Sequence, residues 1–516
     1  MMEVVSARKA IEAIKDGSSV AVSGFVAVAN PEYVLSEVEK SFLETGKPRN
    51  LTLIWDAAVG DARGGGVDHL GHKGLVAKAI SAHCNMNPKL QKMIDNNEIP
   101  AHILPLGSMS QLYREIGAGK PGLFSKVGLG TYVDPRHGGA KANRITTEEL
   151  VELTHIHGEE FLFYKAFPMD VAIIRGTTAD TKGNITCEHE PCLCDIMVTA
   201  QAVKHNGGIV IVEVENVCEY GSLNPRDIIV PGFMVDYVVV APKDQHPMTF
   251  GHPDYNPNWA QEYRIPLDDV PKLKMDARGL IARRAALELK PHQIVNLGFG
   301  VPEGIASVCA EDGCSDKITL TVECGHVGGV PASGLDFGAC TNSEYVVDMT
   351  RQMDWYEGGA LDITFLGAAE VDKDGNANVT KFNGRTVGPG GFLNIASTAK
   401  KVCYCGSLTA GGLKVAVEDG KLIIKQEGKI KKYVPAVEQI SFSGKQAYAQ
   451  GQEVLYITER AVFRLTADGP MLVEIAPGID LQTQVLDQIA FPVAVSPDLK
   501  SMDPRIFTDD VLHLGL

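Results

Sequence analysis

The chain has little of what a membrane, secreted or nucleic-acid-binding protein needs. It has no apolar run approaching the roughly 20 residues that cross a bilayer. Its N-terminus, MMEVVSARKAIEAIKDG, has no basic segment followed by an apolar one, so we expect no secretory signal and a cytoplasmic location. Basic residues number 48 against 64 acidic ones, for a net charge of −16. Nucleic-acid binding needs a basic face, so we expect neither a nucleic-acid nor a membrane partner.

Cysteines are few and scattered. Their number, eleven, is odd and fits reduced cytoplasmic thiols better than a disulfide framework. One cluster of possible soft-metal ligands lies within CEHEPCLC: Cys187, His189, Cys192 and Cys194. Structural zinc sites use ligand pairs around a longer loop, so we predict no metal there. A set of histidines beside DARGGGVDHLGHKG is predicted to lie on the surface or in a pocket: His69, His72 and His83.

The residues that are present indicate an α/β protein. Hydrophobic residues make up 45% and charged residues 22% of 516 residues, which suits a globular chain of two or three domains. The strand candidates are apolar on both faces, as in parallel sheets covered by helices. They are VAVSGF, DVAIIRG, GIVIVEV, DYVVVA, QIVNLGFG, KITLTVE, DITFLG and KVCYC.

Two pairs of segments resemble each other. Ser6 precedes the helix ARKAIEAIK and the strand SSVAVSGF, while Asp276 precedes the helix ARGLIARRAALELK and the strand HQIVNLGFG. Both residues are good helix caps. DVAIIRGTTADTKGNIT, from Asp170, and LDITFLGAAEVDKDGNANVT, around Asp362, each hold an apolar strand and then an acidic turn containing Gly-Asn. The pattern predicts an internal duplication: two related open α/β domains with largely parallel sheets.

The two copies differ in length. Gly24 and Gly298 are 274 residues apart, whereas Gly183 and Gly375 are 192 apart, so the first copy holds 82 more residues between its landmarks. We place this extra segment at about residues 60–150.

A proline-rich stretch without apolar periodicity separates the copies and is predicted to be a linker. The expected organisation is an N-terminal half at 1–245, a linker at 246–274 and a C-terminal half at 275–516. Near the C-terminus, Asp419-Gly420 and Asp468-Gly469 lie between apolar runs and predict antiparallel hairpins.

A glutamate occupies a suggestive place in ITLTVECGHVGGVPASG. Glu323 ends an apolar strand, and a glycine-rich loop follows with Gly325, Gly328 and Gly329. The carboxyl end of a parallel strand faces the crevice in which α/β folds bind ligands. Glycines let backbone N–H groups approach a substrate and stabilise an oxyanion. A glutamate at a strand end is also often a simple solvated residue, so the segment alone leaves both interpretations open.

The turn NLGFGVPEG offers a competing interpretation. Gly298, Gly300 and Gly304 follow a strand and open a helix, and Glu323 comes 23 residues after Gly300. A dinucleotide-binding turn has a similar form, with a ribose-binding acid about 20 residues further on. The spacing is G-x-G-x-x-x-G rather than G-x-G-x-x-G. A nicotinamide-dependent dehydrogenase therefore stays open, as does a non-catalytic domain that binds a small metabolite.

The chain resembles the class I CoA-transferases over nearly its whole length, and most closely the single-chain propionate and acetate CoA-transferases. DGSSVAVSGFVAVANP is similar to their N-terminal signature, with Ser23-Gly24-Phe25 in place of Gly-Gly-Phe. GIVIVEVENVCEYGSLNPRDIIVPGFMVDYVVVA is similar to the end of their first half, and VNLGFGVPEGIA to the turn near coenzyme A. TVECGHVGGVPASGLDFGA resembles the segment of the nucleophilic glutamate, with Cys324 where propionate-type enzymes have serine.

This resemblance implies a function and a set of site residues. The enzyme would transfer coenzyme A between a short-chain acyl-CoA and acetate, propionate, butyrate or lactate, with Glu323 forming a glutamyl-CoA thioester. Gly24 and Phe25 would border the acyl pocket. The residues implied to border coenzyme A or the oxyanion are Gly298, Gly300, Gly388, Gly390 and Gly391.

The resemblance also bears on partners. It implies no separate cofactor, because coenzyme A is a co-substrate, and a homodimer or homotetramer. GTYVDPRHGG, residues 130–139, is similar to a loop of propionate-type enzymes that could act as a gate or an interface. We expect Cys324, beside Glu323, to pack rather than react.

Overall fold

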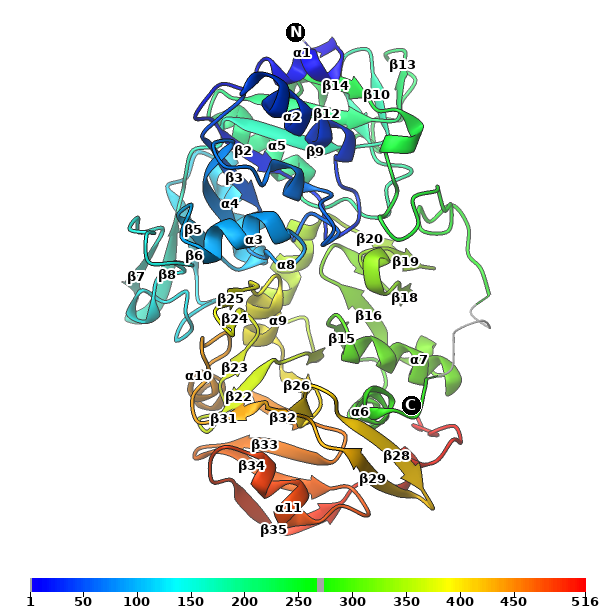
Figure 1. Ribbon diagram of the computed structural model, residues 1–516. Helices are drawn as coiled ribbons and strands as arrows, with labels where there is room; N and C mark the ends of the chain where they lie inside the picture. The colour runs from blue at the N-terminus through cyan, green and yellow to red at the C-terminus, as the bar shows by residue number, and fades with distance from the viewer. Residues whose placement is uncertain (1, 267–272) are drawn as a thin grey trace.

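The computed structural model describes residues 2–266 and 273–516. The first half of the chain forms the upper part of the molecule in Figure 1 and the second half the lower part. Each half is built around one large sheet. Within the described ranges, no helix combines the length and the apolar character that a bilayer crossing requires.

The first sheet has eight strands in the order β1-β14-β12-β9-β2-β3-β4-β5, and every neighbouring pair is parallel. The central strands are buried along their whole length, as their apolar sequences predict. The strands are β1 (Glu3–Val4), β2 (Ser19–Val22), β3 (Leu51–Trp55), β4 (Val76–Ser81), β5 (Ala101–Ile103), β9 (Val171–Arg175), β12 (Ile209–Val214) and β14 (Tyr237–Val240).

Helices and one small sheet surround the first large sheet. The helices are α1 (Ala7–Ile11), α2 (Glu32–Thr45), α3 (Pro88–Asp95), α4 (Leu106–Gly117) and α5 (Ile196–His205). Ser6 caps α1 as predicted, because its Oγ accepts a hydrogen bond from the Lys9 N–H. A separate antiparallel sheet of β6 (Gly122–Ser125), β8 (Glu159–Lys165) and β7 (Val151–Ile156) precedes β9 and overlaps the region of the extra segment.

The second sheet has ten strands in the order β20-β17-β16-β15-β21-β26-β32-β33-β34-β35. Pairing is parallel from β16 to β32 and antiparallel where β17, β20, β33 and β34 are added. The strands are β15 (Ile294–Leu297), β16 (Thr319–Val322), β17 (His326–Val327), β20 (Tyr345–Val346), β21 (Ile363–Leu366), β26 (Lys401–Cys405), β32 (Glu453–Ile457), β33 (Ala461–Thr466), β34 (Gly469–Ile475) and β35 (Ala494–Ser501).

The helices of the second half are α6 (Ala277–Ala286), α7 (Gly304–Glu311), α8 (Met349–Glu357), α9 (Phe392–Thr398), α10 (Gly444–Ala449) and α11 (Leu481–Gln484). Asp276 caps α6 by accepting from the N–H groups of Arg278 and Gly279. The helix ends at Ala286, four residues before the end of the predicted segment, ARGLIARRAALELK.

The two halves repeat one topology. The order β14-β12-β9-β2-β3 matches β32-β26-β21-β15-β16. The two acidic turns used as landmarks also match. Asp180 accepts hydrogen bonds from the N–H groups of Lys182 and Asn184, and Asp372 accepts from those of Asp374 and Asn376. The predicted fold class, two related α/β units with largely parallel sheets, is confirmed.

The C-terminal hairpins form where the sequence predicts them. Asp419 and Gly420, both at positive φ, join β28 (Lys414–Glu418) to β29 (Lys421–Gln426). In the second hairpin, Thr466 pairs with Gly469, so the loop residues are 467 and 468 and the glycine begins β34.

The remaining short strands are β10 (Thr178–Asp180), β11 (Ile185–Thr186), β13 (Asn216–Cys218), β18 (Val330–Pro331), β19 (Cys340–Thr341), β22 (Glu370–Asp372), β23 (Ala377–Asn378), β24 (Lys381–Phe382), β25 (Arg385–Thr386), β27 (Thr409–Ala410), β30 (Ile430–Lys431) and β31 (Tyr433–Val434).

The predicted linker is only partly described. Residues 246–266 contain no regular helix or strand, and 267–272, with Pro271, lie outside the described residues. His246 is anchored in the first half, where its Nδ1 lies 2.8 Å from Oε1 of the buried Glu213. The two halves also share one hydrophobic core, in which α4 packs against α8 and α9. That junction positions the candidate site.

Candidate active site

Glu323 lies in a tight loop at the carboxyl end of β16. Val322 pairs with His326 across the loop, and the Gly325 N–H donates to the Val322 carbonyl over 3.0 Å. Gly325 has a φ of 120°, and a Cβ there would lie 1.8 Å from the Val347 carbonyl oxygen, so only glycine fits. The loop thus turns β16 into the antiparallel β17 and leaves the Glu323 side chain at the edge of the sheet.

The Glu323 carboxyl group is largely buried. Its Oε2 is buried without a hydrogen-bond partner among the described residues, and the side chain of Asn296 lies nearby. Burial raises the pKa of Glu323 to about 7, and the nearby backbone N–H and the Asn296 side chain oppose this only in part. The carboxylate is therefore weakly solvated and unusually basic for its type.

A buried hydrogen-bond network fixes Asn296. Its Nδ2 lies 3.4 Å from both the Thr321 carbonyl oxygen and the Tyr356 hydroxyl, and its Oδ1 accepts from Thr364 over 3.0 Å. Tyr356 in turn donates to Thr321 Oγ1 over 2.8 Å. These bonds hold the amide in one orientation near Glu323. Asn296 was not among the predicted site residues, although a polar residue within the apolar strand QIVNLGFG is a usable signal.

The glycine-rich segment GPGGF lies across the site from β16. The Gly390 N–H donates to the Ala82 carbonyl over 3.0 Å, and the Cys84 N–H donates to the Val387 carbonyl over 2.7 Å. These backbone bonds fasten residues 387–391, from the second half, to residues 82–84, from the first.

Gly391 places a backbone donor beside the carboxylate. A Cβ at this position would lie 3.5 Å from Glu323 Cγ, so the two residues are in contact. The Gly391 N–H precedes α9 and makes no hydrogen bond among the described residues. It is free to stabilise a negative oxygen that forms near Glu323.

These elements enclose a cavity of about 410 Å³, which we call the Glu323 pocket. Most of its lining is apolar, and it comes from both halves of the chain. The predicted site residues that line it together are Phe25, Gly298, Glu323, Gly388, Gly390 and Gly391. Two others lie elsewhere. Gly24 is not part of the lining and packs against Asn30, whereas Gly300 lines a neighbouring cavity.

Aromatic side chains join the halves at the pocket. Phe25, from the first half, lies 5.9 Å from Phe337 between ring centroids, and Phe337 lies 5.6 Å from Phe299. Phe25 and Phe337 are buried, while Phe299 is 60% exposed. The three rings form an apolar wall that continues from the pocket to its mouth.

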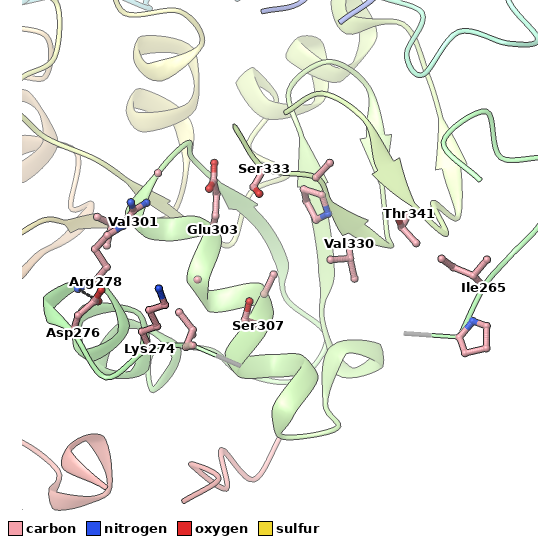
Figure 2. Close-up of a pocket in the computed structure, with 17 residues that line it drawn as sticks. Ile265, Lys274, Asp276, Arg278, Val301, Glu303, Ser307, Val330, Ser333 and Thr341 are labelled. Carbon is pink, nitrogen blue, oxygen red and sulfur yellow. Dashed lines mark hydrogen bonds between the residues drawn. The ribbon is translucent and has the colours of Figure 1, made fainter. Parts of the chain in front are cut away.

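The neighbouring cavity, of about 690 Å³, is shown in Figure 2, and we call it the Lys274 cleft. Lys274 and Arg278 come from the start of α6 on one side, and Val330 and Thr341 come from strands on the other. The turn 298–301 separates the two cavities, since Gly298 lines one and Gly300 the other. Two carboxylates, Asp276 and Glu303, line the cleft as well, and Asp276 already accepts from the first N–H groups of α6, so the two cationic side chains are what an anionic ligand would contact.

The cysteine cluster does not form a metal site among the described residues, where no set of three or more suitable ligands comes together. Cys192 Sγ lies 3.5 Å from Cys194 Sγ, and His189 pairs with Glu215. All eleven cysteines, each within the described chain, are free thiols.

Cys324 and two of the predicted histidines have structural partners. The Cys324 thiol is buried and donates to the Gly338 carbonyl, and burial raises its pKa, which keeps it uncharged and unreactive. On the surface of the first half, His69 and His72 contact the carboxylate of Glu39. His83, by contrast, lines the Glu323 pocket.

Known proteins resemble this chain over almost its whole length. The family model for coenzyme A transferase matches residues 4–241 and 280–404. The chain is 46% identical over 514 residues to the caffeate CoA-transferase of Acetobacterium woodii, covering 99% of this chain and 98% of that one. It is 42% identical over 516 residues to the acetate CoA-transferase YdiF of Escherichia coli K12, covering 99% and 96%. The crystal structure of the acyl-CoA transferase YdiF of Escherichia coli O157:H7 as a thioester complex with CoA matches with a TM-score of 0.94 at 40% identity, covering 99% of this chain and 97% of that one.

Proposed function

Because the chain belongs to the coenzyme A transferase family, we propose that Glu323 is the carboxylate through which it carries coenzyme A from one acid to another. One observation carries this assignment: among the residues that line the pocket between the two halves, Glu323 is the only carboxylate. In the alternative interpretation, Glu323 would bind the ribose of a nicotinamide cofactor. Glu323 lies instead in a mostly apolar pocket, in contact with Gly391. The relative with 40% identity was crystallised as a thioester with CoA, which supports a covalent route.

The proposed reaction keeps its carbonyl groups activated throughout. A Glu323 oxygen attacks the acyl-CoA carbonyl carbon, the carbon–sulfur bond breaks, and an acyl–glutamyl anhydride and a thiolate result. The thiolate then attacks the glutamyl carbonyl carbon and releases the first acid as its carboxylate, which leaves glutamyl-CoA. A second carboxylate repeats these two steps in reverse order. No bond is hydrolysed, so no outside source of energy is needed.

The environment of Glu323 suits its two proposed roles, as the attacking carboxylate and as the group that carries coenzyme A. A pKa of about 7 leaves half of the side chain ionised near neutral pH and makes the ionised form more basic than an exposed glutamate. In the tetrahedral intermediates the Gly391 N–H, which has no partner among the described residues, is proposed to stabilise the oxyanion. The apolar wall of Phe25, Phe299 and Phe337 excludes water, which would otherwise hydrolyse the thioester.

The Lys274 cleft is proposed to hold the nucleotide end of coenzyme A. Its phosphates are anionic, and the cleft offers the ammonium of Lys274 and the guanidinium of Arg278. The pantetheine arm would pass the 298–301 turn to reach Glu323. Gly298 and Gly300, on opposite sides of that turn, are proposed to border it. We propose no separate cofactor or metal, since coenzyme A itself is the co-substrate.

The acids are proposed to be short-chain monocarboxylic acids: acetate, propionate, butyrate or lactate. No lysine or arginine lines the Glu323 pocket among the described residues, so a second carboxylate on the substrate would be buried without a partner. Free thiols at all eleven cysteines accord with the proposed cytoplasmic location. The proposed homodimer or homotetramer can be measured by light scattering.

The test is the mass of the intact protein after incubation with acetyl-CoA and removal of free ligand. We expect an added mass of one coenzyme A less one water, lost on treatment with hydroxylamine, which cleaves thioesters. Glu323→Gln should show no adduct. Asp56→Asn is the matched control, because Asp56 is an acid at the corresponding strand end of the first half and should not be needed for the adduct. Turnover by Glu323→Gln at the wild-type rate would refute the assignment.

A further inference from the structure

His83 is a buried titratable group at the site that the proposed reaction leaves unused. It follows β4, lines the Glu323 pocket and comes from the opposite half of the chain to Glu323. A Cβ on Gly390 would lie 3.9 Å from His83 Cδ2, and a Cβ on Gly391 would lie 3.5 Å from Glu323 Cγ. The imidazole and the carboxylate therefore flank the same two glycines.

Few side chains in this pocket can form a hydrogen bond. Of the residues that line it, only His83, Asn85 and Glu323 have polar side chains. Asn85 is tied to Arg385, because its Oδ1 accepts from that guanidinium over 3.0 Å, and its Nδ2 stays available as a donor. His83 and Asn85 are thus the side-chain donors in the described lining, and of the two His83 lies against Gly390.

The backbone around His83 is fixed. Its carbonyl accepts from Trp55 Nε1 over 3.0 Å, and its N–H donates to Ser81 Oγ over 3.1 Å. The residues on either side, Ala82 and Cys84, are bound to the glycine segment 387–391. A ring on such a loop keeps its position relative to Glu323, which is what substrate positioning requires.

The imidazole of His83 is neutral and carries one N–H. Burial lowers the pKa of His83 to about 4. Nδ1 is buried without a partner, and Nε2 makes no hydrogen bond within the described residues. An unpaired N–H in a dry site is rarer than an unpaired acceptor, so the proton belongs on Nε2, where a substrate oxygen can accept it.

We propose that His83, as a neutral donor at Nε2, binds an oxygen of the substrate carboxyl group and orients the acid for reaction with the carbonyl carbon held on Glu323. The inference rests on the proposed function of Glu323. During the attack, one carboxylate oxygen forms the new carbon–oxygen bond and the other stays hydrogen-bonded to His83. The electron pair leaves with the coenzyme A sulfur, and His83 keeps its proton throughout.

A neutral donor has a specific advantage over a cation here. A buried lysine or arginine would bind the free carboxylate strongly and would lower its reactivity before attack. A single N–H of an uncharged ring orients the carboxylate oxygen but stabilises the free carboxylate less than a cation would. The free-energy barrier from the bound carboxylate to the transition state is therefore smaller. The same donor can also serve the acyl carbonyl oxygen of the incoming acyl-CoA.

Two variants of His83 and one matched control test the proposal. His83→Leu should lower kcat/KM for acetate and propionate by about 10- to 100-fold, because the donor is lost. His83→Gln, which keeps an N–H near the Nε2 position, should recover most of that activity. His102→Leu is the control, since His102 is also buried in the first half but its Nε2 donates to the Glu148 carbonyl, away from the pocket. It should leave kcat/KM unchanged in the folded protein.

Three readouts separate positioning from a structural effect. The Kd for free coenzyme A should be the same in all folded variants. The midpoint of the pH profile of kcat/KM should be the same in His83→Gln as in wild type. By NMR, the His83 ring should not change its protonation between pH 5 and 8. Activity of His83→Leu within twofold of wild type, or an equal loss in His83→Gln, would overturn the inference. If Glu323→Gln kept its activity, the proposed function itself would fail instead.

Discussion

The two halves of the chain place an acidic residue at the same point of the same topology and use it differently. Asp56 directly follows β3, and Glu323 directly follows β16, the corresponding strand. Asp195 precedes α5 of the first half, and Gly391 precedes α9, the corresponding helix of the second. In the first half the space beside the strand-end acid is filled by a second carboxyl group. In the second half a glycine leaves it open to the pocket.

The electrostatics of the two acids follow from this difference. Both oxygens of Asp56 and Oδ2 of Asp195 are buried without a hydrogen-bond partner among the described residues, and the charge of Asp195 acts on Asp56. Two neighbouring carboxyl groups in such a site cannot both ionise at little cost, so the pair retains one proton. Burial first, and then the charge of Asp195, raises the pKa of Asp56. Asp195 is further held by Ser23, whose Oγ donates over 2.6 Å.

The comparison shows that position at a strand end does not by itself make an acid reactive. Asp56 is only 1% exposed, and its neighbour Asp195 holds the loop of Ser23, Gly24 and Phe25 through Ser23. Glu323 differs in having no carboxyl neighbour and a pocket in front of it.

The largest expected effect comes from removing the reactive acid. Glu323→Gln should lower turnover by roughly four orders of magnitude or more, because an amide cannot form the anhydride or the thioester. Steady-state transfer from acetyl-CoA to propionate measures this. If Asp56→Asn lost as much activity while remaining folded, the distinction between the two acids would be wrong.

The next variant makes the second half resemble the first. Gly391→Asp places a carboxyl group beside Glu323, which should raise its pKa further and fill the space of the oxyanion. We expect a loss of about 10²- to 10³-fold in kcat and little adduct in the mass measurement. Gly384→Asp is the control, since Gly384 has a φ of 71° and open space around it. An active Gly391→Asp enzyme would show that the glycine is not what distinguishes the halves.

The pH dependence should distinguish the two acids as well. Glu323 attacks as the carboxylate, so with a pKa of about 7 the value of kcat/KM for acyl-CoA should fall tenfold per pH unit below 7. At pH 5 it should be about a hundredfold below its plateau, and Asp56→Asn should keep the same midpoint. A midpoint near 4.5, the usual value for glutamate, would contradict the buried environment of Glu323.

The smallest effect concerns stability. The folded protein holds a proton on the Asp56–Asp195 pair at pH values where the unfolded chain, with an aspartate pKa of 3.8, has lost it. The free energy of unfolding contributed by the pair should therefore fall as pH rises above about 4. Asp56→Asn removes this loss, so its free energy of unfolding, measured by denaturant titration, should decline less between pH 5 and 8 than that of wild type, by on the order of 1 kcal/mol. Equal declines would mean that no proton is shared.

Much of the fold is predictable because its signals are local. Continuous apolar runs predict the parallel strands, Ser6 and Asp276 predict helix starts, and Asp419-Gly420 predicts a hairpin from two residues that tolerate positive φ. The antiparallel turn after Glu323 was not predicted. Its Gly325 is required by a contact with Val347, which no local pattern reveals.

The site is only partly predictable. Glu323 and the glycines of residues 388–391 lie in short motifs, and they do meet in one pocket. Asn296 and His83 act through contacts that the fold creates, since one lies in the middle of a strand and the other comes from the opposite half. Gly24 and Gly300 were grouped with the others by motif alone, and the chain places them outside the Glu323 pocket.

The attachment between residues 82–84 and 387–391 has a consequence for how this sequence can change over time. The bonds that join the two segments run between main-chain N–H and carbonyl groups: Gly390 to Ala82, and Cys84 to Val387. Substitutions at Ala82, Cys84 or Val387 exchange side chains without removing a donor or an acceptor, provided that proline is avoided at position 84. Side chains of the pocket lining that do not take part in these main-chain bonds can therefore change, and with them the preference for one acid over another, while the bonds between the halves are kept.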